Sequence, residues 1–373
     1  MAKNVFQKIY YNSLKRVYRG FTGTVLNNVV SDIPDLIAYF KKVYRETPFE
    51  KRVLITYHNH LWEPILSLAS YLGLRKKVGV QNWLDENDIA NILNISGFEI
   101  IRTQKHLLGL IMTTIARKGK GQGKPSKEYG VSVIIPARNE EENIPKIVPS
   151  IPMFGKWLEV IFVEGHSTDH TWETINKQIT KYANGKRKSD KQIIVRRFKQ
   201  KGKGKADAVW LGFTKAKGDI LMIYDADRTV DANDLPKFYN VLASGLGEFA
   251  NGSRLVYPME HDSMRFLNQI GNKLFGFIFT KIFGQPFKDT LCGTKAIFRK
   301  DYLYLRKHNK KYFSMDPFGD FALIFGAVKN NLKVIEIPVR YKERVYGSTN
   351  ISRFRHGLML LKMTVAAFKE FWA

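Results

Sequence analysis

The sequence predicts an α/β fold with a mixed sheet flanked by helices, and two observations lead to it. First, short apolar runs recur between residues 131 and 223, and each ends in polar or acidic residues, as buried strands of a parallel sheet do. Second, residues typical of helix starts follow several of these runs, which gives the alternation of strand and helix found in α/β domains. The chain has 373 residues, 44% of them apolar, which suffices for one large domain and a smaller additional piece.

The strands of the large domain are expected at apolar runs, which are residues 131–135, 158–163, 193–195 and 220–223. Pro136 has no N–H to donate, so we expect it to end the first strand, with a helix beginning near Glu141. Polar residues after the runs, Arg138 and Glu140 among them, are expected at the carboxyl edge of the sheet. Open α/β sheets bind their ligands at that edge.

An Asp-x-Asp pair, Asp225 and Asp227, follows the last of these runs. Two carboxylates at this spacing repel each other unless a positive charge lies between them. Mg²⁺ and Mn²⁺ fit, because they take a few carboxylates and complete their shell with phosphate oxygens. The pair therefore predicts a Mg²⁺ or Mn²⁺ site that holds a nucleotide diphosphate. The alternative is a solvated turn, in which such pairs are common.

A glycine- and lysine-rich segment, Lys201 to Lys205, precedes a helix. Glycines let the backbone approach a ligand closely, and lysines beside a helix N-terminus attract phosphate. We therefore expect Lys203 to contact the phosphates of the nucleotide.

Composition changes along the chain predict its division into parts. Residues 1–117 are expected to form a small α/β accessory segment, and residues 118–130, rich in glycine and lysine, a linker. Residues 131–350 are expected to form the main domain and residues 351–373 an amphipathic C-terminal helix.

The net charge of +26 indicates an anionic partner. No helix-turn-helix or RNA-binding signature accompanies it, so we expect phosphorylated substrates and an anionic membrane surface, and no nucleic acid. Cys292 is the only cysteine, which excludes an intramolecular disulfide. Neither a signal peptide nor a run of about 18 apolar residues is apparent. We therefore expect a cytoplasmic protein that lies against the inner face of the plasma membrane.

The ordered motifs of the main domain resemble those of glycosyltransferase family 2, which has the GT-A fold. They are Pro136-Ala-Arg-Asn-Glu140, the acidic turn at Glu164, the glycine–lysine segment and Asp225-Ala-Asp227. The resemblance covers about 60% of the chain. It implies an enzyme that uses a nucleotide-diphosphate sugar, with Asp225 and Asp227 at the metal. The donor-binding residues that it implies are Pro136, Arg138, Glu140, Glu164, Lys203 and Arg344. Glu164 stands where the family more often has aspartate.

The second half of the domain resembles the dolichyl- and polyprenyl-phosphate sugar synthases of this family. The resemblance lies in Asn251-Gly-Ser-Arg254, in the segment 289–295 and in the segment 343–351. It implies that Arg254 and Arg265 bind the lipid phosphate and that Arg344 closes on the donor diphosphate.

Three acids of this half are candidates for a role beside the acceptor. Asp289 is expected near it, either as a general base or as a group that orients an arginine, and Asp316 and Asp320 are further candidates. The catalytic set therefore comprises Asp225, Asp227, Asp289, Arg254 and Arg265.

The N-terminal segment resembles the C-terminal half of class I S-adenosylmethionine methyltransferases. The resemblance lies in residues 57–64 and 82–98. The glycine-rich turn that holds the cofactor in such enzymes is missing, so no S-adenosylmethionine is expected.

Together these features predict a metal-dependent inverting glycosyltransferase that moves a sugar from a nucleotide diphosphate to a polyprenyl phosphate at the membrane surface. A separate membrane protein is a further expected partner. Two alternatives remain open. One is transfer to a saccharide hydroxyl, with Asp289 or Asp316 as base. The other is a non-catalytic basic protein that binds membranes or nucleic acid on a decayed transferase scaffold.

Overall fold

The chain folds into two compact units, which a computed structural model describes. Unit 1 comprises residues 1–119 with 283–285, and unit 2 comprises residues 120–282 with 286–373. The described residues are 18, 21–59, 62–74, 82, 84–107, 109–119, 128–182, 187–188, 191–256, 266–344, 346 and 353–371. Most of the predicted linker and Arg265 lie outside them.

Unit 1 contains a four-stranded sheet in the order β1-β2-β4-β3. Its elements are β1 (Gly23–Asn27), η1 (Val29–Asp32), α2 (Leu36–Glu46), β2 (Arg52–His58), α3 (Glu63–Tyr71), α4 (Glu86–Ile95), β3 (Phe98–His106) and β4 (Ile111–Lys118). Local sequence explains where helix α4 begins: the Asp85 carboxylate accepts the N–H of Asp88, and the Asp88 carboxylate accepts the N–H of Asp85. The apolar side chains of α2 and α4 pack with those of the strands in one core.

The four strands of unit 1 do not all run in one direction. Here β1 and β2 are parallel, but β4 runs antiparallel to both β2 and β3. Unit 1 is therefore a small mixed α/β layer of its own.

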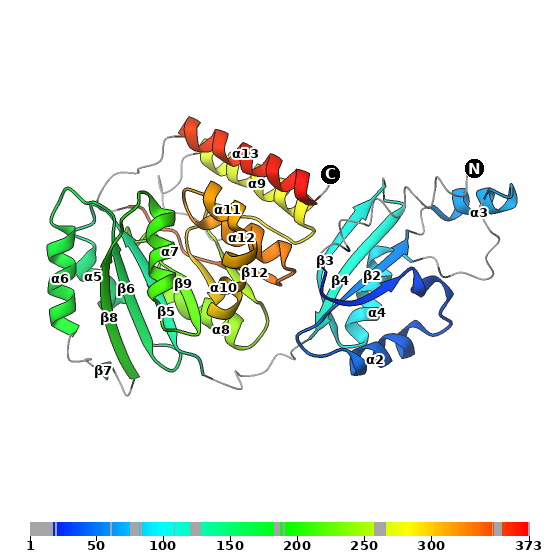
Figure 1. The fold of residues 1–373 in the computed structure, drawn as a ribbon, viewed down its shortest axis with the longest axis horizontal. Helices are drawn as coiled ribbons and strands as arrows, with labels where there is room; N and C mark the ends of the chain where they lie inside the picture. The colour runs from blue at the N-terminus through cyan, green and yellow to red at the C-terminus, as the bar shows by residue number, and fades with distance from the viewer. Residues whose placement is uncertain are drawn as a thin grey trace. The chain divides into compact units, whose positions relative to one another are not determined.

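Unit 2 contains an eight-stranded sheet in the order β12-β10-β11-β9-β5-β6-β8-β7 (Figure 1). The elements of its first half are β5 (Val131–Ala137), α5 (Ile144–Ser150), β6 (Leu158–Glu164), α6 (Thr171–Tyr182), β7 (Arg187–Lys188), β8 (Lys191–Lys199), α7 (Lys205–Lys215), β9 (Ile220–Ile223) and η3 (Ala232–Asp234). Those of its second half are α8 (Leu235–Ala243), β10 (Phe249–Ser253), α9 (Phe266–Phe283), β11 (Lys295–Phe298), α10 (Arg299–His308), α11 (Lys310–Met315), α12 (Asp320–Lys329), β12 (Val334–Pro338) and α13 (Arg353–Phe371).

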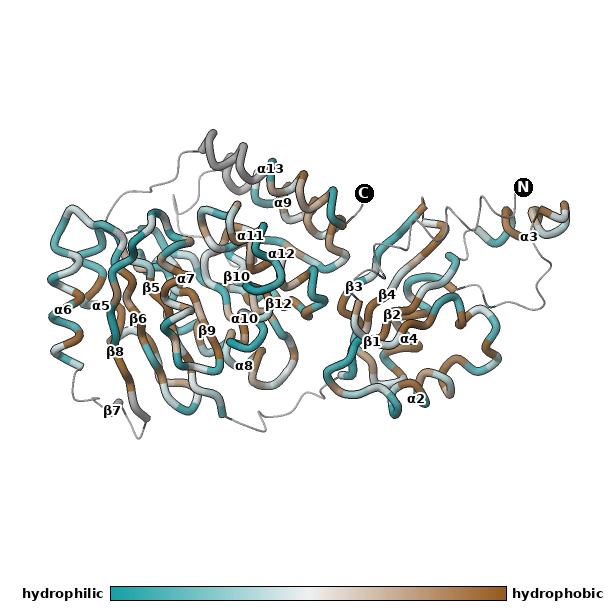
Figure 2. The backbone as a smooth tube through the Cα atoms, in the orientation of Figure 1, coloured by the Kyte–Doolittle hydropathy of each residue, from teal (hydrophilic) through white to brown (hydrophobic). Residues whose placement is uncertain are grey.

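The sheet of unit 2 is mixed, so the predicted fold class is confirmed. Strands β9, β5, β6 and β8 are parallel to their neighbours among these four, whereas β11 runs antiparallel to β9 and to β10. Each of the four predicted apolar runs forms one of the parallel strands. Strands β5, β6 and β9 are hydrophobic and buried along most of their length (Figure 2), as expected for strands covered on both faces.

Helices cover the two faces of this sheet because alternate residues of each strand point to opposite sides. Val133 and Ile135 of β5 pack in a core with Ile147 of α5 and Phe238 of α8. Ile134 points the other way, toward α7. A Cβ at Gly212 of α7 would lie 2.5 Å from Ile134 Cγ2, so the glycine lets α7 approach the sheet closely.

The end of β5 differs from the prediction. Strand β5 continues through Pro136 to Ala137, which pair with Val163 and Glu164 of β6. Proline is tolerated at the end of a strand, where losing one N–H donor costs little. The following helix begins at Ile144, three residues later than expected, after a turn.

No helix among the described residues is long and apolar enough to cross a membrane. The predicted C-terminal helix is present as α13. Over its described side chains it buries Met363 and Ala367 and exposes Leu361, Val365 and Phe368.

Candidate active site

The carboxyl ends of β5, β6 and β9 meet at one edge of the sheet, because the three strands are neighbours and run parallel. Just past each end lies a non-glycine residue with left-handed backbone: Asn139 with φ 55°, His166 with φ 59° and Arg228 with φ 57°. Such conformations cost energy, and they concentrate at functional sites. This edge is therefore where the fold holds its polar side chains in fixed positions.

Asp227, the second carboxylate of the Asp-x-Asp pair, is held from two sides. Its Oδ1 accepts hydrogen bonds from the N–H and the hydroxyl of Thr229, at 3.1 and 2.9 Å. Its Oδ2 accepts a hydrogen bond from Arg344 Nη2 at 2.5 Å. Arg344 Nη1 also lies 3.7 Å from Glu140 Oε1. Three residues predicted to bind donor or metal thus lie together, from three distant parts of the sequence.

Glu140 is a buried carboxyl with an altered pKa. Its Oε2 accepts a hydrogen bond from Asn143 Nδ2 at 2.6 Å, and its backbone N–H donates to Thr171 Oγ1 at 2.8 Å. Burial raises the pKa of Glu140 from 4.5 to about 7, although Asn143 and Arg344 both oppose the rise. Near neutral pH this carboxyl is therefore close to half-protonated.

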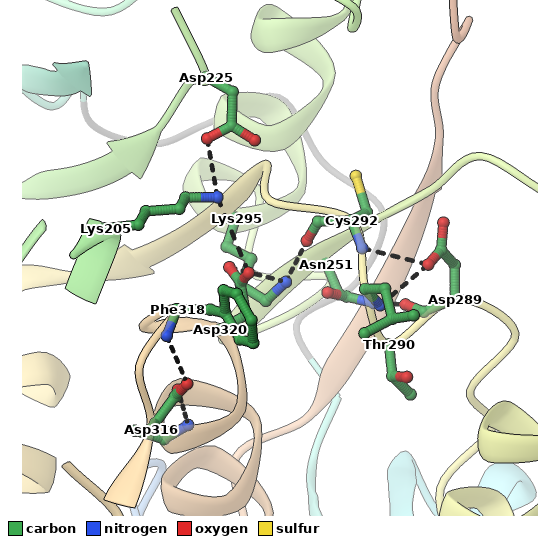
Figure 3. A network of polar contacts seen from close by, with 12 residues as sticks. Lys205, Asp225, Asn251, Asp289, Thr290, Cys292, Lys295, Asp316, Phe318 and Asp320 are labelled. Carbon is green, nitrogen blue, oxygen red and sulfur yellow. Dashed lines mark hydrogen bonds and ion pairs between the residues drawn. The ribbon is translucent and has the colours of Figure 1, made fainter. Parts of the chain in front are cut away.

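Asp225, the first carboxylate of the pair, faces a lysine (Figure 3). Lys205 Nζ lies 2.7 Å from Asp225 Oδ1 and 3.7 Å from Asp320 Oδ2. Burial disfavours a charged ammonium, but the Asp225 and Asp320 carboxylates outweigh it and hold the pKa of Lys205 above its ordinary value. Lys205 is therefore a permanent cation fixed between two acids.

Asp320 connects this cation to a second lysine, which is buried. Lys295 of β11 is buried, and its Nζ lies 3.5 Å from Asp320 Oδ1 and donates to the backbone carbonyl of Cys292 (Figure 3). Gly293 lies against the same group: a Cβ there would come within 2.1 Å of Asp225 Oδ2 and 2.4 Å of Lys205 Nζ. Only glycine fits at this position while the Lys205–Asp225 pair keeps its geometry.

Arg254, the residue after β10, forms a bidentate pair with Asp289. Asp289 Oδ2 accepts hydrogen bonds from Arg254 Nε at 2.7 Å and from its backbone N–H at 3.0 Å, and Oδ1 accepts from Nη2 at 2.9 Å. The Arg254 guanidinium also lies over the ring of Tyr341, with Cζ 5.0 Å from its centroid. The arginine predicted to meet the acceptor is therefore held in one orientation.

Asp289 receives further donors and stays ionised. Asn272 Nδ2 donates to its Oδ1 at 2.7 Å, as do the N–H groups of Leu291 and Cys292 at 3.0 and 3.1 Å. Burial alone would raise its pKa, but Arg254 and the hydrogen bond from Asn272 lower the pKa of Asp289 to about 2. A carboxylate so strongly stabilised as an anion is a poor general base.

Asp316 also uses its carboxylate to hold the backbone. It accepts the N–H groups of Phe318 at 2.9 Å and Ala322 at 2.8 Å. Burial raises the pKa of Asp316 to about 6. Its contacts fix the start of α12, from which Asp320 reaches the lysines.

The remaining predicted donor residues lie at the same edge of the sheet but make fewer contacts there. Glu164, the last residue of β6, is buried, and its Oε1 accepts the N–H of Ser167 at 2.5 Å. Arg138 and Lys203 are exposed, and Pro136 is half-buried.

The charges of this site suit a divalent cation held together with a diphosphate. Asp225 and Asp227 each already face a positive group, Lys205 and Arg344 respectively. Over the described part of the chain, no cluster of three or more His, Cys, Asp or Glu side chains forms a complete metal site. Asp227 could hold a divalent cation whose remaining ligands are phosphate oxygens, which is how Mg²⁺ and Mn²⁺ commonly bind with phosphates.

Residues 132–305 match the family described as Glycosyl transferase family 2. Residues 132–305, which apart from 283–285 lie in unit 2, therefore belong to glycosyltransferase family 2. The family match begins at the start of β5, after unit 1, and the predicted methyltransferase likeness of unit 1 is not supported.

Several curated relatives of this glycosyltransferase act on lipid phosphates, according to their names. The dolichol-phosphate mannosyltransferase of Pyrococcus furiosus is 29% identical over 245 residues, which cover 62% of this chain and 64%, just under two thirds, of that enzyme. A UDP-N-acetylglucosamine–dolichyl-phosphate N-acetylglucosaminyltransferase of Methanococcus voltae is 26% identical over 245 residues, 62% of this chain and 96% of that one.

Solved structures also align with the glycosyltransferase. A mannosyltransferase from Pyrobaculum calidifontis in complex with GDP-Man and Mn²⁺ is 17% identical and has a TM-score of 0.43. The alignment covers 68% of this chain and 71% of that one.

From the sequence, Lys203 was the predicted phosphate-binding residue of this segment. Lys205, which contacts Asp225, was not predicted. Gly204 has φ 89° and α7 begins at Lys205, so the turn directs the last lysine of the segment toward the Asp-x-Asp pair. Gly204 indicates in the sequence where the helix starts. Nothing in the sequence indicates that Lys205 pairs with Asp225, which lies 20 residues later.

Proposed function

We propose that this glycosyltransferase is a metal-dependent, inverting enzyme that moves a sugar from a nucleotide diphosphate to a polyprenyl phosphate. We further propose that it does so at the cytoplasmic face of the membrane. The names of its relatives support the acceptor class, and the charges at the sheet edge support the donor class.

The acceptor side supplies the observation that carries the proposal. Asp289 is the acid expected beside the acceptor, and it accepts hydrogen bonds from Arg254 and Asn272 with a pKa of about 2. A saccharide hydroxyl needs a base to remove its proton, whereas a phosphate is already an anion and needs a cation to position it. A fixed arginine whose acidic partner cannot act as a base therefore favours a phosphate acceptor.

On the donor side, Arg344 and Lys205 provide the positive charges for the diphosphate. Arg344 Nη2 contacts Asp227 at 2.5 Å, so a donor diphosphate entering beside Asp227 meets the guanidinium at once. When bound at Asp227, a divalent cation supplies neutralisation of the charge that develops on the departing diphosphate. Glu140, beside Arg344, lines the same place.

The proposed reaction is a single displacement. An oxygen of the acceptor phosphate attacks the anomeric carbon from the side opposite the diphosphate. The bond from that carbon to the diphosphate oxygen breaks, and its electron pair leaves with the nucleoside diphosphate, so the configuration inverts. No proton has to move, which agrees with an acceptor side where Asp289 stays ionised.

The test is a transfer assay with purified full-length protein, Mn²⁺ and a panel of nucleotide sugars, with and without a polyprenyl phosphate. Mass spectrometry detects the glycolipid. We expect a product that requires the lipid phosphate and disappears in the Asp227→Asn variant.

Other results would lead away from the proposal. Nucleotide release that a saccharide stimulates and the lipid phosphate does not would favour a hydroxyl acceptor. Membrane or nucleic-acid binding without any metal-dependent nucleotide affinity would favour the non-catalytic alternative.

A further inference from the structure

Helix α3 of unit 1 is built unlike helices α2 and α4 of that unit. Helices α2 and α4 bury apolar side chains in the core, among them Phe40 and Leu93. Helix α3 buries none of its residues. Large apolar residues on it and just after it are each at least 55% exposed, namely Ile65, Leu68, Tyr71, Leu72 and Leu74. Figure 2 shows hydrophobic positions along α3.

Four of these residues, all but Leu74, follow helical spacing, so they form one stripe on the outside. Ile65, Leu68 and Leu72 recur at intervals of three and four, and Tyr71 lies three residues after Leu68. The less exposed Leu66 and Ser70 lie on the opposite side. A surface helix normally turns its apolar stripe toward the core. Helix α3 turns it to the solvent, which marks an interaction site.

We propose that the apolar stripe of α3 inserts into the interfacial layer of a lipid bilayer. The sequence around it favours lipid over a protein partner. Trp62 precedes the helix and Tyr71 ends it, and tryptophan and tyrosine favour the boundary between lipid and water. The basic sequence 75–77, Arg-Lys-Lys, follows, which suits anionic headgroups.

The length and charge of α3 agree with a helix that lies in the membrane surface. It has nine residues, or about 14 Å at 1.5 Å per residue, which is less than half of a bilayer core. Glu63, at its first position, is its only charged residue. The choice of lipid as the occupant rests in part on the proposed function, since a polyprenyl phosphate stays in the bilayer. The stripe would hold unit 1 at the same surface.

The test compares two variants of the full-length protein by flotation with vesicles of phosphatidylcholine and phosphatidylglycerol, without donor or acceptor. Leu68→Asp adds a charge within the stripe. Ser67→Asp adds the same charge to the neighbouring exposed residue, which is already polar and lies about 100° around the helix from Leu68. We expect Leu68→Asp to weaken vesicle binding about tenfold and Ser67→Asp to change it less than about twofold. Both residues are unburied, so both variants should fold, which circular dichroism checks.

A fluorescent label gives a second, independent readout. The natural Cys292 is fully buried, so a Leu68→Cys variant can be labelled selectively with an environment-sensitive dye. Insertion predicts a blue shift and a brighter signal when vesicles are added. Equal vesicle binding by wild type and Leu68→Asp, with an unchanged dye spectrum, would overturn the proposal. Self-association lost in Leu68→Asp, with unchanged vesicle binding, would assign the stripe to a second copy of the chain. Because the assay contains no substrates, failure of the proposed enzymatic function would leave its result intact.

Discussion

Replacing Glu140 by glutamine is expected to stabilise the protein at alkaline pH and to leave its stability unchanged in acid. The pKa of this buried carboxyl is about 7 in the folded protein, against an ordinary 4.5. Because folding raises the pKa of an acid, the folded state favours the protonated form. The stability contributed in this way is complete below pH 4.5 and is lost as the pH rises through 7.

The size of the effect follows from the two pKa values. Their difference of about 2.5 corresponds to about 3 kcal/mol, the free energy of keeping an ionised Glu140 in its buried site at pH 8. Glutamine carries no charge at any pH, so Glu140→Gln should exceed the wild type in unfolding free energy by up to about 3 kcal/mol at pH 8. At pH 4.5 or below the two proteins should differ by less than about 0.5 kcal/mol.

Urea denaturation at pH 4.5 and pH 8 measures this difference. Fluorescence of Trp210 contributes to the signal from unit 2, since it is buried among the rings of Tyr302 and Phe313. Glu173→Gln is the control, because Glu173 is exposed on α6 and its substitution should give no gain at pH 8. The reasoning fails if Glu140→Gln changes stability equally at both pH values.

Three further substitutions test the charged groups of the site. Asp227→Asn should lower turnover at least a hundredfold, because it removes the carboxylate proposed to hold the cation, while the melting temperature stays within about 5 °C; near-normal turnover would contradict the metal role. Lys205→Met should reduce kcat about tenfold or more, because Asp225 loses the cation 2.7 Å away. For the same reason, urea denaturation should show a loss of about 1–3 kcal/mol in the free energy of unfolding. An unchanged kcat would show that this ion pair has only a structural role. Asp289→Asn should raise the KM for the lipid phosphate about tenfold and leave the donor KM within about twofold, because Arg254 loses its bidentate partner. A larger effect on the donor KM would place the Arg254–Asp289 pair beside the donor and contradict its proposed role at the acceptor.

The positions of the strands could be predicted from the sequence because apolar runs that end in polar residues carry a local signal. The runs 158–163 and 220–223 lie in β6 and β9, so the carboxyl edge and its acids followed directly. The first strand was predicted to end at Pro136, because only the pairing of Pro136 with Val163 shows that the strand continues through the proline.

The contacts that neutralise the site could not be predicted in the same way. Lys205 meets Asp320 across 115 residues of sequence, and no periodicity indicates which lysine of a glycine-rich turn will do so. From the sequence, Asp289 was a candidate either for a general base or for a group that orients an arginine. Only the hydrogen bonds from Arg254 and Asn272 distinguish a fixed anion from a base.

The bond from Arg344 to Asp227 has a consequence for the order in which the active complex assembles. A guanidinium from the chain and a cation from solution compete for the same carboxylate oxygen. Without nucleotide, Arg344 neutralises the Asp227 carboxylate and disfavours metal binding there. A nucleotide diphosphate gives Arg344 another anion to bind, so that Asp227 can bind the metal. The two ligands are coupled, and linkage requires each to strengthen the other equally. Titration calorimetry should show Mn²⁺ binding at least about tenfold tighter with nucleoside diphosphate present, and Arg344→Ala should remove most of that gain. Equal Mn²⁺ affinity with and without the nucleotide would rule out this competition. We therefore expect the enzyme to hold a metal most tightly while a donor is bound.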